Sequence, residues 1–469
     1  MDATRARTLT LVATILGSGI ALLDGTIVNV ALPAIEEDLG GGLAGQQWVV
    51  NAYLLTLGSL ILVGGSLGDL YGERRIFALG VAGFGFASVL CALAPTIETL
   101  VAARAVQGAT SALLTPASLA LIATTFDDEK ERAAAIGTWT AWAGIAAVAG
   151  PVIGGQIVDV ASWRWIFAVN VPLVIVTLAL IYVAVERDEH VERKGRRIDV
   201  VGALLTAFGL AGPVVALVEQ PQRGWTSPVV LLGLVGGAIL LVAFVAWERR
   251  VRDPMLPLEL FENRNFSVTN VETLLVYAGL SSLFFFLTIF LQSVAGYSAL
   301  ESGLAGLPVT IFLFFLSSRI GALSARFGPR LFMGVGPLVA AVGVFLLVRL
   351  DEHVDYARDL LPAMIVFGLG LAMTVAPLTA TVMAEAGRGD SGIASGVNNA
   401  VARVAGLLGI AVVGVAVACR SGAELDLAGF RLGMAITGVV VGAGGVVGLL
   451  GIRNPAVASD EDPVVSSSS

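Results

Sequence analysis

"GSLGDLYGERR" at residues 65–75 and "GALSARFGPR" at residues 321–330 are two copies of one loop pattern. Four residues recur at one constant separation along the chain: Gly65, Leu67, Gly72 and Arg74 in the first copy, and Gly321, Leu323, Gly328 and Arg330 in the second. Each copy ends one long apolar run and opens a short loop to the next run. A parallel repeat of this kind predicts that the chain contains two related halves.

The composition is that of a membrane protein. The 469 residues are 56% hydrophobic and 14% charged, whereas soluble domains carry about 25% charged residues. Apolar runs recur along the whole chain and match the roughly 20 residues that a helix needs to cross about 30 Å of hydrocarbon. Strands of a membrane barrel would instead alternate over about 10 residues. We therefore expect an all-α integral membrane protein.

Fourteen spans are expected from these runs. They lie near residues 9–33, 47–68, 76–95, 97–126, 133–158, 165–185, 199–218, 227–247, 266–293, 301–324, 331–350, 359–385, 392–418 and 431–452. The loop repeat assigns six spans to each half, and the remaining two follow the basic stretch "ERKGRR" (192–197). The expected units are a six-helix bundle (1–185), a basic linker with two inserted helices (186–265), a second bundle (266–452) and a disordered tail (453–469).

The orientation follows from the distribution of positive charge. Most of the 28 Lys and Arg residues lie in connections on the side of the N-terminus, and positive loops are retained in the cytoplasm. We therefore expect both termini to be cytoplasmic, in a multi-pass protein of the cell membrane.

Several stretches resemble one transporter family. "GSLGDLYGERR" is similar to the loop between spans 2 and 3 of the major facilitator superfamily, and "RAVQGATSALLTP" (104–116) resembles its span 4 motif. "LDGTIVNVALP" (23–33) and "SWRWIFAVNVP" (162–172) look like fourteen-span drug:proton antiporters of the QacA/EmrB kind. The resemblance implies the fold of that superfamily, with two six-helix bundles and two inserted helices, and export of drugs in exchange for protons.

The loop motif also has a physical interpretation. Its expected gating residues are Gly65, Asp69, Gly72, Arg74 and Arg75. Glycine permits a sharp turn, and the carboxylate of Asp69 can face a helix N-terminus, where anions are favoured. The candidate partner is the start of span 13, within residues 389–396. The second copy has Ala325 at the position of Asp69. The alternative is a charge cluster that only stops membrane insertion.

"GIAAVAGPVIGG" (144–155) in span 5 resembles the antiporter motif of the same superfamily. Small residues four apart allow a neighbouring helix to approach closely, and a proline permits a bend. The motif residues are Gly144, Gly150, Pro151, Gly154 and Gly155. Tight packing alone would explain them. The resemblance implies in addition that this span lies between the two halves and limits leakage.

Four ionisable residues lie well inside the spans: Asp24, Arg104, Glu272 and Arg403. Charges near the bilayer centre are expensive and mark functional sites. At about 1.5 Å per residue, Asp24 and Arg104 lie at similar depth and could meet. We expect Asp24, Arg104 and Glu272 to serve proton coupling. For Asp24 the alternatives are a static ion pair with Arg104 or recognition of a cationic substrate. For Glu272 they are substrate recognition or a place at the cytoplasmic mouth.

These observations predict a proton-coupled exporter of small amphipathic drugs or antibiotics that works by alternating access in the lipid bilayer. Its substrate cavity is expected to contain Asn29, Asn51, Gln107, Tyr277 and Phe284. The alternatives are an exporter of one metabolite, such as a self-made antibiotic, a siderophore or a lipid, and a membrane receptor that does not transport.

Other classes of function are not expected. The 2 cysteines and 2 histidines are scattered, so the sequence predicts no metal site, no cofactor and no enzyme. No P-loop is present, which argues against ATP as the energy source. The net charge of -8 argues against a nucleic-acid partner.

Overall fold

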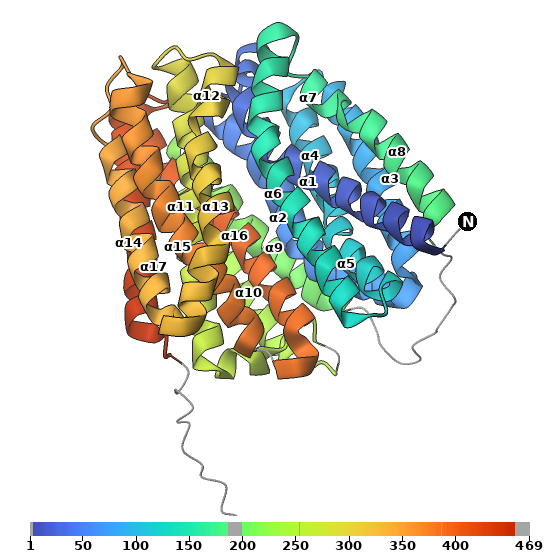
Figure 1. Cartoon of the computed structure of the whole chain (residues 1–469). Helices are drawn as coiled ribbons and strands as arrows, with labels where there is room; N and C mark the ends of the chain where they lie inside the picture. The colour runs from blue at the N-terminus through green and yellow to red at the C-terminus, as the bar shows by residue number, and fades with distance from the viewer. Residues whose placement is uncertain (1–2, 186–198, 253, 386, 455–469) are drawn as a thin grey trace, which may run out of the picture.

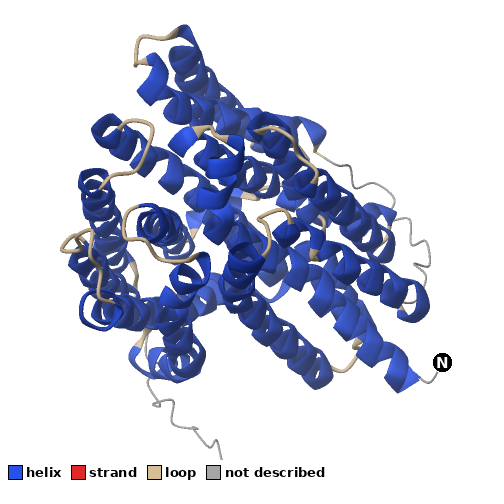
Figure 2. Ribbon diagram, turned by 90° about the horizontal axis from the view of Figure 1, so that it is seen from above, coloured by secondary structure: helices blue, strands red, loops and turns tan. Residues whose placement is uncertain are grey.

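The computed structural model describes residues 3–185, 199–252, 254–385 and 387–454, with the side chains of 387–392 left out. The basic stretch 192–197 and the tail 455–469 lie outside the described residues. Within them the secondary structure is helical, and the helices run side by side across the molecule (Figure 1, Figure 2).

The first group of helices covers the N-terminal part of the chain. They are α1 (Ala3–Leu39), α2 (Gly42–Tyr71), α3 (Glu73–Ala92), α4 (Ile97–Ser111), α5 (Leu114–Thr125), α6 (Glu129–Val160), α7 (Trp165–Ala168) and α8 (Asn170–Ala184). Two further helices follow, α9 (Val200–Arg223) and α10 (Pro228–Glu248).

The remaining elements are η1 (Leu258–Glu262), α11 (Arg264–Ser293), α12 (Ala299–Ala305), α13 (Leu307–Phe327), α14 (Pro329–Leu347), η2 (Tyr356–Leu360), α15 (Leu361–Glu385), α16 (Gly387–Ser421) and α17 (Leu427–Gly451). In the described part of the chain, 14 helical segments are long and apolar enough to cross a membrane. The predicted number of spans and the all-α membrane class are thereby confirmed.

Several spans are longer than the apolar runs that predicted them. The first span was expected to end at Pro33, but α1 continues to Leu39 through Glu36 and Glu37. The second was expected to end near residue 68, but α2 continues to Tyr71. Backbone hydrogen bonds extend a helix beyond the hydrocarbon thickness wherever its residues tolerate helical geometry, so hydropathy alone underestimates the length.

The helices form two neighbouring sets (Figure 1). Helices α1–α8 pack mainly on one another, and α11–α17 do the same. The face of the molecule where α1 begins and α17 ends is called here the terminal face. It also carries the α2–α3 and α13–α14 turns. The other end, with the α1–α2 and α16–α17 connections, is called the opposite face.

The loop repeat is visible in the structure. Gly72 and Gly328 have φ values of 96° and 86° between their helices, a conformation that favours glycine. Arg74 Nη2 donates to the carbonyl of Tyr182 at 3.2 Å, and Arg330 Nε donates to the carbonyl of Leu449 at 2.7 Å. Each arginine thus places a cation at the C-terminal end of the last helix of its own set, where it is favoured by the helix dipole.

Candidate functional site

Asp24 lies in the interior of the N-terminal set. Its side chain, on α1, is 0% exposed, and that of Arg104, on α4, is 1% exposed. Arg104 Nη1 lies 2.5 Å from Asp24 Oδ2. The sequence suggested that these two side chains could meet, and they form a buried, charge-assisted hydrogen bond.

Two amides complete the surroundings of the carboxylate. Gln107 Nε2 donates to Asp24 Oδ1 at 2.9 Å, and Asn170 Nδ2 donates to the same oxygen at 3.1 Å. Both amides also reach Ser88 Oγ, at 2.9 and 3.4 Å. We call these five residues the Asp24 cluster. Its side chains come from α1, α3, α4 and α8, so one polar network ties four helices together.

Arg104 is held from several directions. Its Nη1 also donates to Gln107 Oε1 at 2.6 Å, and its Nε donates to the carbonyl of Val49 at 3.1 Å. The guanidinium carbon lies 4.3 Å from the centre of the Tyr53 ring, a favourable cation–π distance. The Tyr53 hydroxyl in turn donates to the carbonyl of Ala21 at 3.1 Å. Arg104 is therefore fixed in place by contacts with α2 and α4 as well as by Asp24.

The sequence identified only part of this cluster. Gln107 was expected in a substrate cavity, but its amide is engaged by Asp24, Arg104 and Ser88. Asn170 and Ser88 were missed. The signal for Asn170 was available, because it is an amide inside the apolar stretch 162–172. Ser88 gave no signal, since a serine in a membrane helix usually bonds to its own backbone.

Glu272 has different surroundings. It lies on α11, is 0% exposed, and neither carboxylate oxygen has a hydrogen-bond partner among the described residues. A Cβ placed on Gly448 of α17 would lie 2.9 Å from its Oε2. The side chain is therefore packed inside the C-terminal set, against α17.

The span 5 motif lies where α6 passes between α1 and α12. A Cβ on Gly150 would collide with Thr26, and one on Gly154 would collide with Ile27. Gly155 faces the other way, and its Cβ would lie 2.5 Å from Leu300 Cα. Nothing lies within 4 Å of a Cβ on Gly144. Three of the four glycines thus permit close approach, two to the N-terminal set and one to the C-terminal set.

The two sets are joined at the opposite face. The Asp159 carboxylate, near the end of α6, accepts hydrogen bonds from the backbone amides of Ala299 and Leu300, both at 2.9 Å. The Leu43 amide donates to the carbonyl of Ala423 at 2.8 Å. These contacts join the ends of α6 and α2 to α12 and to the connection after α16.

Toward the terminal face, α6 and α13 separate. Residues 136–142 of α6 and 314–327 of α13 are largely exposed, with Trp142 at 51% and Phe315 at 60%. A helix packed between two neighbours would bury most of its circumference. The two sets are therefore joined at the opposite face, and α6 and α13 are exposed along these stretches toward the terminal face.

The loop motif forms the tight α2–α3 turn described above. A Cβ on Gly65 would lie 3.6 Å from Pro116 Cβ. Asp69 and Arg75 are exposed at this turn. The expected contact of Asp69 with the start of span 13 involves side chains of residues 387–392 and lies outside the described residues.

Among the described residues, the other side chains expected in the cavity form no hydrogen bond with the Asp24 cluster. Asn51, on α2, is 0% exposed, and neither atom of its amide has a hydrogen-bond partner among the described residues. Tyr277 and Phe284 lie on α11, and Asn29 lies on α1; all three are half-buried. The ring centre of Phe284 lies 6.4 Å from that of Phe367.

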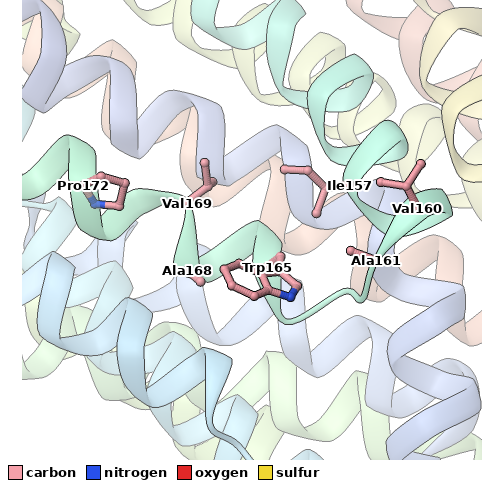
Figure 3. A pocket seen from close by; sticks show the side chains of 7 residues that line it. All are labelled: Ile157, Val160, Ala161, Trp165, Ala168, Val169 and Pro172. Carbon is pink, nitrogen blue, oxygen red and sulfur yellow. The ribbon is translucent and has the colours of Figure 1, made fainter.

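One surface hollow lies outside this region (Figure 3). Its volume is about 390 Å³, and it is open and lined by apolar side chains at the opposite-face ends of α6, α7 and α8, namely Ile157, Val160, Ala161, Trp165, Ala168, Val169 and Pro172. None of the expected site residues lines it, and we assign it no part in the site.

A family model of the Major Facilitator Superfamily matches residues 14–410. The chain belongs to the major facilitator superfamily. The two sets of helices in this superfamily member, and the motifs on α2, α4 and α6, agree with that assignment.

Similar members of the superfamily are resistance proteins. The puromycin resistance protein pur8 of Streptomyces alboniger is 41% identical over 399 residues, covering 84% of this chain and 78% of the relative. The multidrug resistance protein Stp of Mycobacterium tuberculosis is 36% identical, covering 90% and 78%. The methylenomycin A resistance protein of Bacillus subtilis is 34% identical, covering 86% of both chains.

Proposed function

We propose that this superfamily member exports small amphipathic drugs or antibiotics across the cell membrane in exchange for protons. The observation that carries the proposal is the Asp24 cluster, an ionisable carboxylate completely buried within the membrane-spanning helices. Such a group is costly to keep and marks a proton or ion pathway by default. The names of the relatives support drugs and antibiotics as the class of substrate.

The proposed cycle uses the carboxylate as a switch. A proton on Asp24 neutralises the carboxylate and weakens its hydrogen bond to Arg104. The helices that the cluster joins can then move relative to one another. Release of the proton on the other side restores the pair. Glu272 is a second candidate proton site in the other set. One charge moving down 100 mV yields about 2.3 kcal/mol, enough for a roughly fifty-fold gradient.

The remaining site residues receive roles in the same proposal. The units 1–185 and 266–452 would rock against each other, with the terminal face in the cytoplasm because the loops there are basic. The state described above, with the two sets joined at the opposite face, would then be open to the cytoplasm. Asp69 and its loop would control that opening, and the α6 glycines that contact neighbouring helices, Gly150, Gly154 and Gly155, would limit leakage. Asn51, Tyr277 and Phe284 are the proposed contacts of the substrate.

The test is an accumulation assay in a host lacking its own efflux pumps. Cells expressing the chain should accumulate less of a fluorescent dye or antibiotic than cells expressing Asp24→Asn, and an uncoupler should abolish the difference. A difference that persists in the uncoupler at normal ATP levels would contradict proton coupling. Equal accumulation across a broad panel would contradict export.

Export of one particular metabolite is the second candidate. It is favoured by relatives such as the tetracenomycin C resistance and export protein of Streptomyces glaucescens, 34% identical over 88% of this chain. The same panel separates the two candidates, because a multidrug exporter lowers the accumulation of several unrelated compounds and a dedicated one lowers that of a single chemical class.

A further inference from the structure

Arg403 is a half-buried cation that the proton mechanism does not use. It lies on α16 within the span Ile393–Ser421, ten residues or about 15 Å from the beginning of that span. This places it near the middle of about 30 Å of hydrocarbon. A Cβ on Gly58 of α2 would lie 3.3 Å from the Cβ of Arg403. The arginine therefore emerges at the interface between the N-terminal and C-terminal sets.

Arg403 has no acidic partner in the described part of the chain. Its Nε is buried and makes no hydrogen bond there, and none of the ion pairs among the described residues includes it. Of the two acids inside the spans, Asp24 is bound by Arg104 and Glu272 is packed against α17. A midplane arginine normally pairs with an acid or with backbone carbonyls, so the free guanidinium indicates an anion that binds from outside the chain.

A second polar group on the same interface is also unpartnered. Gln47, Leu54 and Gly58 of α2 contact α16, and Asn51 lies on the same helical stripe, four residues from the first and seven from the last. Both atoms of its buried amide lack a hydrogen-bond partner among the described residues. Buried polar groups are almost always hydrogen-bonded. Two unpartnered groups on one interface therefore point to a ligand that supplies their partners.

The neighbouring helix contributes a hydroxyl. A Cβ on Gly409 of α16 would lie 2.7 Å from Ala278 Cα of α11, so the two helices touch beside Tyr277. The Arg403 guanidinium of α16 and the Asn51 amide of α2 thus lie where the two sets meet, and the Tyr277 phenol lies on α11, which packs against α16.

We propose that Arg403 binds an ionised acidic group of the exported compound, and that the substrates therefore include amphipathic organic acids. The planar guanidinium offers paired N–H donors that match a carboxylate, while Asn51 and Tyr277 donate to the rest of the polar head. The proposal rests on the export function and specifies its substrate class. The ligand would contact Arg403 of the C-terminal set and Asn51 of the N-terminal set. Its affinity would therefore depend on how far apart the two sets lie.

The test uses two compounds of equal shape. Anthraquinone-2-carboxylate and anthraquinone-2-carboxamide differ only in the charged group, and their binding to the purified full chain in a neutral maltoside detergent is measured by equilibrium dialysis. The wild type should bind the carboxylate on the order of tenfold more tightly or better. Arg403→Gln should remove that preference and change carboxamide binding by about twofold or less. Arg403→Lys should keep part of the preference.

The control is Arg420→Gln, which removes the same charge from an exposed position on the same helix and should leave both affinities unchanged. Equal binding of the two compounds by the wild type would overturn the proposal, and so would equal weakening of both by Arg403→Gln. If Arg403→Gln does not fold, the preference of the wild type for the carboxylate over the carboxamide, and the same preference in Arg403→Lys, still test the proposal. Uphill export of the neutral carboxamide by a protein with no carboxylate preference would leave the export function standing and reject the anion site alone.

Discussion

Replacing Asp24 by Asn separates a coupling acid from a static ion pair. The substitution keeps the shape of the side chain but removes its charge. Asp24 accepts hydrogen bonds on both oxygens, from Arg104 on one and from Gln107 and Asn170 on the other. An asparagine has only one acceptor oxygen. Its NH₂ group would therefore face either Arg104 or the amides of Gln107 and Asn170, and the hydrogen bonds on that side would be lost. Breaking a buried pair in this way costs about 3–5 kcal/mol, a large part of the roughly 5–15 kcal/mol that stabilises a typical fold.

The double variant Asp24→Asn with Arg104→Gln should recover much of that loss, because the glutamine oxygen can accept from the new NH₂ group. Neither variant can carry a proton at position 24. We therefore expect unfolding temperature to fall in Asp24→Asn and to recover in the double variant, while uphill export stays absent in both. The measurements are scanning fluorimetry in detergent and substrate-induced proton release from proteoliposomes. Restored uphill export in the double variant would refute the coupling role and leave Glu272 as the acid to test.

Three further predictions concern the rest of the chain. A reporter fused after the last residue should lie in the cytoplasm and one in the 351–359 loop outside; labelling of both from one side would contradict the span count. Asp69→Asn should impair transport with normal expression, whereas Ala325→Asn should have little effect, and equal damage in transport assays would indicate a purely structural loop. Gly154→Ala should lower unfolding temperature and export, since overpacking costs about 1–3 kcal/mol, while Gly144→Ala should change neither; equal behaviour in both assays would argue against the packing role.

The sequence predicted the fold better than the site. Apolar runs of membrane length and the repeated loop were sufficient for fourteen spans, because in hydrocarbon every backbone group must be satisfied within a helix. The ends of the helices were less predictable, since α1 extends through Glu36 and Glu37, beyond the apolar part. Hydropathy indicates whether a segment lies in lipid or in water, but it does not give the length of the helix that contains the segment.

The contacts within the site depend on how each helix is rotated about its own axis, which the sequence does not specify. The depth of Asp24 and Arg104 followed from counting residues, but depth does not say which helix a side chain faces. Gln107 was therefore expected in the cavity, although it faces Asp24. For Glu272 the depth left a place near cytoplasmic water open, and it gave no sign that the side chain faces α17. Asn170 was overlooked because the interior of the N-terminal set brings together four spans whose mutual rotation is fixed only by packing.

The inserted helix α9 has a consequence for the way the molecule can move. It packs against both α2 and α16, with Val214 and Val218 in one apolar cluster with Leu407 and Ala411. In the described part of the chain no helix lies in this way across α6 and α13. In the proposed cycle the edge covered by α9 would act as the hinge, and the two sets would separate most along the uncovered edge. A compound dissolved in the leaflet at the terminal face would then enter between α6 and α13, sideways from the lipid, without first passing through water.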